Sequence, residues 1–190
     1  MGTRNVTIIK FNGEEKVRQY GQWDGYPTSA LASIVEFLKT DGAIEHLKRN
    51  VVKCKFAAED TNTFPAKAQE IVNATYKIGY IAETRKKMEK LAEYLSMRMD
   101  IIFKYILATR DTGYEIPNVL IMPEADTASE IILCKAYTNE CDWQIEAVNI
   151  IDLDAELIIS YWHGDKMMWD FNCLPDEEEI ESYEKRFWES

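Results

Sequence analysis

Residues 5–22, which read NVTIIKFNGEEKVRQYGQ, are the strongest guide to the fold that we expect for this chain. Its opening residues 5–11 are β-branched or apolar on both alternating faces, which predicts a largely buried strand. Asn12 and Gly13 follow, and both tolerate the positive φ angles of a tight turn. Residues 16–22 are therefore expected to return beside the first strand and to complete an N-terminal hairpin.

Helical patterns follow the hairpin. Pro27 favours an extended residue before it, and Thr28 or Ser29 is expected to cap the first helix. Apolar residues at steps of three and four predict one long amphipathic helix from Met88 to Ile106. The helices expected in this part of the chain cover residues 28–39, 41–50 and 88–106, and the pattern is also helical from about residue 65.

The C-terminal part of the chain changes period. Alternating apolar residues predict strands over 130–137, 143–152, 156–162 and 166–171. Asp176 is expected to cap a last helix, with Glu179 as its capping-box partner. The apolar face of that helix is expected to consist of Ile180, Tyr183, Phe187 and Trp188.

Together these patterns predict an α+β fold in one domain that covers residues 1–190. We expect a mainly antiparallel sheet that includes the N-terminal hairpin and the C-terminal strands. The central segment is expected to be helical and to contain the long helix, and a last helix is expected to follow the strands.

Length and composition favour a globular chain. It has 190 residues, of which 46% are hydrophobic and 12% aromatic, and no apolar run approaches the ~18 residues needed to span a bilayer. The N-terminus shows no export signal, so we expect a cytoplasmic protein with reduced cysteines. His46 and His163 match no metal-binding spacing. We therefore expect no metal, no cofactor and no membrane contact.

The charge is unevenly distributed along the chain, whose net charge is −11. Residues 1–110 hold 18 basic against 13 acidic residues, a net of +5, whereas residues 111–190 hold 4 against 20, a net of −16. Two interpretations stay open. The acids face water, or they form a docking surface for a protein with a basic surface, such as a nucleic-acid-binding protein. Direct binding to nucleic acid is disfavoured, because phosphate recognition needs clustered cations.

Three parts of the chain resemble a widespread family of bacterial and phage proteins of unknown function. Gly2-Thr3-Arg4, a hairpin and QYGQWDGYP at 19–27 are similar to the family's G-T-R opening, strand and W/Y/F-D-G/S-Y-P turn. Its S-R-D-T-G and C-E-W…Y-V-I-D-L-D segments resemble 109–113 (TRDTG), 141–143 (CDW) and 149–154 (NIIDLD). The resemblance implies a shared fold but no activity. Pro117 is a departure, because the family has a regular helix there.

The turn at 19–27 gathers aromatic, amide and carboxylate groups, and Arg4 is placed to reach Asp24. The predicted cluster comprises Arg4, Gln19, Gln22, Trp23, Asp24, Tyr26, Arg110 and Asp111. One interpretation is a buried or half-buried ionic network, roofed by Trp23 and Tyr26, that pins strand ends to the helices. Another is a pocket for a nucleotide-like molecule that carries a phosphate or carboxylate. A third makes Asp24 and Asp111 paired carboxylates for acid–base chemistry.

These observations favour a non-enzymatic accessory protein of a phage or mobile element that acts by binding. In its most concrete form it inhibits a bacterial defence system through its acidic surface. Two alternatives stay open: a protein that binds or sequesters a nucleotide-like ligand through the predicted cluster, and a hydrolase of unknown substrate. No catalytic residue is assigned, because the chain contains no phosphate-binding loop, nucleophile elbow or zinc-ligand spacing.

Overall fold

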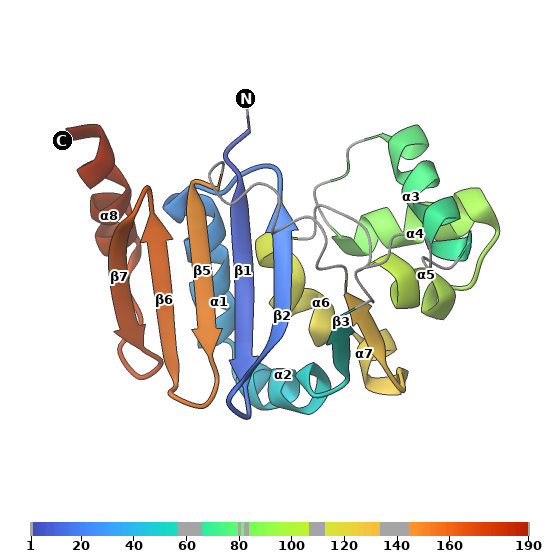
Figure 1. The fold of residues 1–190 in the computed structure, drawn as a ribbon, viewed down its shortest axis with the longest axis horizontal. Coiled ribbons are helices and arrows are strands. Elements are labelled where there is room, and N and C mark those ends of the chain that lie inside the picture. Colours follow the sequence, from blue (N-terminus) through green and yellow to red (C-terminus); the bar gives the residue numbers. More distant parts are fainter. Residues whose placement is uncertain are drawn as a thin grey trace.

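Five strands form the main sheet of this computed structural model, which describes residues 2–56, 66–79, 81, 84–106, 113–133 and 145–189. The strand order is β2-β1-β5-β6-β7, and the pairs are antiparallel except that β1 and β5 run parallel. The strands are β1 (Asn5–Phe11), β2 (Glu14–Gly21), β5 (Ala147–Asp152), β6 (Leu157–Trp162) and β7 (Asp165–Asp170). The fold is α+β with a mostly antiparallel sheet, as predicted (Figure 1).

The N-terminal hairpin forms where the sequence predicts it. Asn12 and Gly13 have φ angles of 55° and 72°, as the tight turn requires. Their backbone amides donate to the two carboxylate oxygens of Asp154, at 3.0 and 2.9 Å. Because Asp154 lies between β5 and β6, the hairpin tip is held by the turn that joins two other strands of the sheet.

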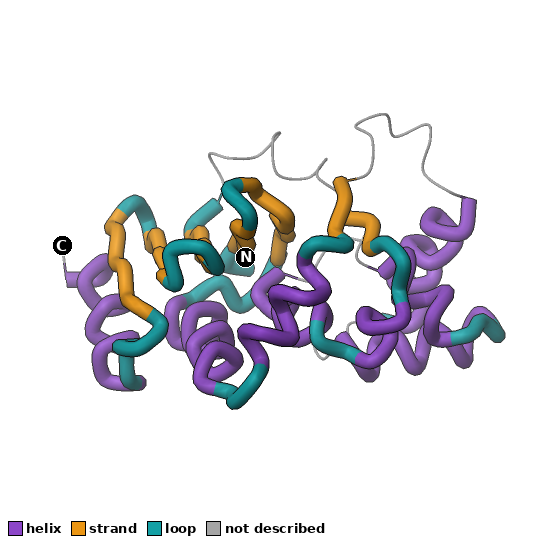
Figure 2. The backbone as a smooth tube through the Cα atoms, turned by 90° about the horizontal axis from the view of Figure 1, so that it is seen from below, coloured by secondary structure: helices purple, strands orange, loops and turns teal. Residues whose placement is uncertain are grey.

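Helices cover one face of this sheet (Figures 1 and 2). Those beside it are the π-helix η1 (Pro27–Leu31), α1 (Ala32–Lys39), α2 (Ala43–Val51), α6 (Ile116–Leu120) and α8 (Glu177–Glu189). Strand residues Ile9, Val17 and Ile158 are fully buried in the core cluster that includes these helices. Alternate residues such as Val6 and Ile8 form a separate, smaller cluster with Val148 and Ile150, as expected for side chains on the opposite face.

The remaining helices lie beyond the β2 edge of the sheet (Figure 1). They are α3 (Ala66–Ile78), α4 (Thr84–Leu95), α5 (Met99–Ile106) and the short α7 (Pro123–Thr127). Between them and β2, the strands β3 (Cys54–Phe56) and β4 (Ile131–Leu133) pair in parallel. Residues 134–137 of the predicted strand 130–137 and residues 143–144 of the predicted strand 143–152 lie outside the described residues.

The apolar stripe from Met88 to Ile106 forms two helices, α4 and α5, where the sequence predicted one. Ser96 adopts a left-handed φ of 53°. Its amide donates to the carbonyl of Glu93, and the amide of Met97 donates to that of Ala92. This pair of bonds is the Schellman motif that closes helix ends. Periodicity alone cannot detect such a break, because the apolar spacing continues across it.

The first helical segment starts after an extended Tyr26, as predicted, but without the predicted side-chain cap. Tyr26 is extended, with φ −58° and ψ 145°, as Pro27 dictates. Neither Thr28 nor Ser29 caps the helix, because the first turn is the π-helix η1 and has no side-chain cap. Near Pro117, the 3-10 helix η3 (Gly113–Glu115) leads into α6, whose first turn accommodates the proline.

The last helix begins at the predicted N-cap, whereas the carboxylate of the predicted capping-box partner Glu179 bonds a different residue. The backbone amide of Glu179 donates to Asp176 Oδ1 at 2.9 Å, so Asp176 is the N-cap. The carboxylate of Glu179 accepts the indole N–H of Trp169 at 2.7 Å. On the predicted apolar face, Ile180 and Tyr183 are buried, whereas Phe187 and Trp188 are 39% and 64% exposed.

Candidate functional site

The turn of the predicted cluster folds back onto the start of β1. The amide of Gly25 donates to the carbonyl of Thr3 at 3.1 Å, and Asn5 Nδ2 donates to the carbonyl of Trp23 at 3.0 Å. Asp24 is exposed, with a left-handed φ of 55°. The turn is therefore held by its backbone, while the side chain of Trp23 stays 48% exposed.

Arg4 forms its ion pair with Glu146, where the sequence predicted Asp24. Its backbone amide donates to Glu146 Oε2 at 2.6 Å, and its Nε lies 3.7 Å from the same oxygen. The cause is the parallel pairing of β1 with β5, which places the residue before β5 beside the start of β1. No ion pair of the described residues joins Arg4 to Asp24.

The two predicted amides do not meet. Gln19 is 2% exposed and lies on the helix-covered face, opposite Thr7 of β1. Gln22 accepts a hydrogen bond from the hydroxyl of Tyr20 at 2.7 Å. Tyr20 belongs to the cluster on the other face of the sheet. The two amide side chains therefore lie toward opposite faces.

Arg110 and Asp111 lie outside the described residues, so their part in the ionic network stays a prediction. Gly113, the next described residue, lies against the end of β2 in the hairpin. A Cβ atom built on Gly21 would lie 3.0 Å from the Cα of Gly113 and 2.8 Å from the amide atoms of Asn5. The segment after Asp111 therefore does reach the end of the N-terminal hairpin.

A row of buried polar side chains crosses the helix-covered face of the sheet. Gln19, Thr7, Asn149 and Ser160 are register neighbours on four adjacent strands, and none is more than 2% exposed. Sequence reasoning missed this row because Asn5 and Thr7 alternate with apolar residues that are also buried. Polar groups in a core favour one register, since a shift would move them against apolar neighbours.

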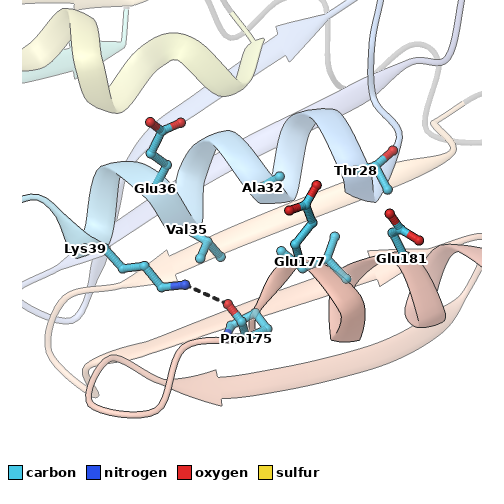
Figure 3. A pocket seen from close by; sticks show the side chains of 9 residues that line it. Thr28, Ala32, Val35, Glu36, Lys39, Pro175, Glu177 and Glu181 are labelled. Atoms are coloured by element: carbon cyan, nitrogen blue, oxygen red, sulfur yellow. Dashed lines mark hydrogen bonds between the residues drawn. The ribbon is translucent and has the colours of Figure 1, made fainter.

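A groove lies between the helices α1 and α8, with a volume of about 360 Å³. Its apolar lining comes from Ala32, Val35, Pro175 and Ile180, and its acidic lining from Glu36, Glu177 and Glu181. Figure 3 shows Glu177 and Glu181 pointing from α8 toward α1 and η1. None of the eight predicted cluster residues lines this groove.

The cation that lines the groove is already engaged. Lys39 Nζ donates to the carbonyl of Pro175 at 2.9 Å (Figure 3). At the other end, Glu184 accepts hydrogen bonds from the hydroxyl and amide of Thr28, at 2.6 and 3.0 Å. These contacts join α8 to α1 and η1 at both ends and leave a row of carboxylates between them.

Glu177 lies in the first turn of α8, where a carboxylate stabilises its own helix. The same carboxylate also lines the groove. Glu177, Glu181, Glu184 and Trp188 recur at steps of four and three, so they share one stripe of the helix. This spacing was present in the sequence, but α1, which completes the groove, is distant along the chain.

Aromatic rings gather at the C-terminal end of α8. The buried Trp162 lies 5.7 Å from Tyr26 and 6.1 Å from Phe187, between ring centroids. His163 stacks on Phe187 at 3.7 Å with an interplanar angle of 11°. These contacts dock the C-terminal turn of α8 onto the end of β6.

His163 predicts a pH dependence of stability. Desolvation against the rings lowers its pKa from the ordinary 6.5, opposed by the nearby Glu146 carboxylate. Well above pH 6.5 the imidazole is neutral whether the chain is folded or unfolded. Below it the unfolded chain binds the proton first, so stability falls until the folded pKa is passed. We expect the free energy of unfolding, measured by urea titration, to fall between pH 7.5 and 5.5.

The variant His163→Asn separates this effect from other titrations, because asparagine tolerates the left-handed φ of 47° at this position. It should be less stable than the native chain near neutral pH, and its stability should depend less on pH over the same range. An identical pH profile in both proteins would show that the stacked imidazole does not titrate as described.

Within the described ranges, no group of three or more His, Cys, Asp and Glu side chains is arranged to hold a metal ion. His46 instead bonds Asp126 at 2.6 Å. No helix in those ranges is both long enough and apolar enough to cross a bilayer. Comparisons with protein-family models, with curated proteins and with solved structures find no match to this chain.

Proposed function

We propose that this protein acts by binding, and that the acidic groove between α1 and α8 docks a basic segment of a partner protein. The observation that carries the proposal is the composition of the groove. Three carboxylates surround an apolar floor, and the lysine at its edge is held by a backbone carbonyl. A cationic segment with apolar residues between its charges complements both parts.

The charge of the surrounding chain supports the same partner. The net charge is −11, and α8 carries acids at Glu177, Glu178 and Glu179 in its first turn alone. An extended negative field raises the rate at which a basic partner meets the surface. A nucleic-acid-binding protein is a fitting partner class, because its phosphate-binding surface is rich in lysine and arginine.

The resemblance to bacterial and phage proteins gives this proposal a concrete form. A protein that covers the basic surface of a defence nuclease would prevent it from reaching nucleic acid. In this form the protein is an inhibitor and needs no catalytic residue, metal or cofactor. Its binding should weaken with salt, and binding that persists unchanged near 1 M salt would contradict an electrostatic mode.

A labelled helical peptide with lysines flanking leucines tests the groove directly, by fluorescence anisotropy. Its counterpart carries glutamate in place of each lysine. The native protein should bind the lysine peptide and should not bind the glutamate peptide. The double variant Glu177→Lys/Glu181→Lys should weaken that binding about tenfold or more, since two reversed charges replace attraction by repulsion at close range.

The matched control is Glu178→Lys/Glu93→Lys, which changes the net charge by the same amount. Glu178 shares the first turn of α8 with Glu177, and both control residues are exposed and outside the groove. The control should lose no more than about twofold. Equal losses in the two double variants would contradict a groove and indicate only a general effect of net charge.

A further inference from the structure

The helix α8, which forms one wall of the groove, carries exposed aromatic residues at its C-terminal end. Tyr26, Phe187 and Trp188 are 37%, 39% and 64% exposed. The rings of Phe187 and Trp188 lie 5.1 Å apart between centroids, with an interplanar angle of 75°. Exposed aromatic side chains gathered in one place are a common mark of a protein-binding surface.

The acids and the aromatics belong to one continuous stripe. Glu181, Glu184 and Trp188 follow one another at three- and four-residue steps along α8. The hydrogen bonds from Thr28 to Glu184 place this stripe against η1, which Tyr26 precedes. A segment that lies along the groove therefore passes from carboxylates to aromatic rings.

We propose that this surface recognises arginine in preference to lysine in the basic segment that it binds. The inference rests on the proposed function and adds the identity of the recognised side chain. A guanidinium is planar, stacks on aromatic faces, and bonds a carboxylate through two parallel donors. An ammonium supplies the same charge but neither the planar stacking surface nor the two parallel donors, so arginine gains more from both the rings and the carboxylates.

Rigidity of the aromatic surface favours this reading. Phe187 is stacked on His163 and lies edge-on to the buried Trp162. Trp188 packs in turn on Phe187. Ring positions fixed by a buried neighbour lose little conformational entropy when a guanidinium stacks on them. The exposed indole of Trp188 is the outermost ring and therefore the one whose removal tests the contact.

The test compares two labelled peptides that differ only in having arginine or lysine at every basic position. Their binding is measured by anisotropy against the native protein and against Trp188→Ala. The native protein should bind the arginine peptide roughly three- to tenfold more tightly, the size of an exposed or partly desolvated cation–π contact. Trp188→Ala should reduce this ratio to near one and retain binding to the lysine peptide.

The outcomes separate this inference from the proposed function. Equal affinity of the native protein for both peptides would overturn the arginine preference and leave the basic groove standing. Binding of neither peptide would overturn both. A preference that survives in Trp188→Ala would also overturn the inference. Light scattering measures the molar mass of both proteins. A native dimer that becomes a monomer in Trp188→Ala would overturn the inference and make this surface an interface between two copies of the chain.

Discussion

Trp162→Ala is expected to lower the free energy of unfolding by roughly 3–5 kcal/mol. Trp162 is 1% exposed and is among the largest fully buried side chains of the described residues. Its ring contacts reach Tyr26 from the N-terminal turn, His163 from the next turn and Phe187 from α8. Because its indole nitrogen has no hydrogen-bond partner among the described residues, the expected loss comes from packing. Guanidinium chloride titration measures it.

Trp188→Ala is the matched control for this experiment. It removes the same side chain from a position that is 64% exposed, so the free energy of unfolding should change by no more than about 0.5 kcal/mol. A similar loss in the two variants would contradict the arrangement of β6 and α8. A small loss in Trp162→Ala alone would mean that the three elements do not pack around this ring.

Gly113→Ala is expected to destabilise the fold by roughly 2–4 kcal/mol, from two additive causes. The residue has a left-handed φ of +51°, which disfavours any Cβ. A Cβ at this position would also lie 3.0 Å from the Cα of Gly21 and 3.2 Å from Asn5 Oδ1. The neighbouring backbone belongs to β2, which is paired along its length with β1 and has little room to move.

Gly42→Ala isolates the first of these causes. Gly42 has a similar φ of +72°, but no described atom lies within 4 Å of the position that its Cβ would occupy. We expect it to cost about 1–2 kcal/mol. The difference between the variants, measured by thermal or urea unfolding, reports the contact between Gly113 and Gly21. Equal losses would show that this segment does not meet the hairpin.

The Gly113 contact bears on the cluster predicted from the sequence. The Arg-Asp pair was expected to meet the N-terminal turn, and Gly113 follows that pair closely in the chain. The approach of Gly113 to Gly21 places this part of the chain at the end of the N-terminal hairpin. Arg4, however, forms an ion pair with Glu146, a residue 142 positions away. A hairpin considered alone offered Asp24 as the nearest acid, because the strand that carries Glu146 to Arg4 was not yet placed.

Local patterns predicted the elements whose causes are local. Asn12-Gly13 identified the hairpin turn, Pro27 the extended Tyr26, and Asp176 the start of α8. Each depends on the conformational preference of one or two residues. Predictions failed where a short-range preference competed with a distant partner. Thr28, a good helix cap, instead donates to Glu184 at 2.6 Å, because α8 brings a carboxylate to it.

Local sequence patterns were sufficient to predict the α+β class, the hairpin, the positions of most strands and the strong acidity of the C-terminal part. These follow from periodicity, turn chemistry and composition, which act between near neighbours in the chain. The parallel pairing of β1 with β5, the position of α8 beside α1, and the groove that their carboxylates share became known from the folded chain. Which segments become neighbours depends on how the whole chain buries its apolar surface, and no local pattern encodes that choice.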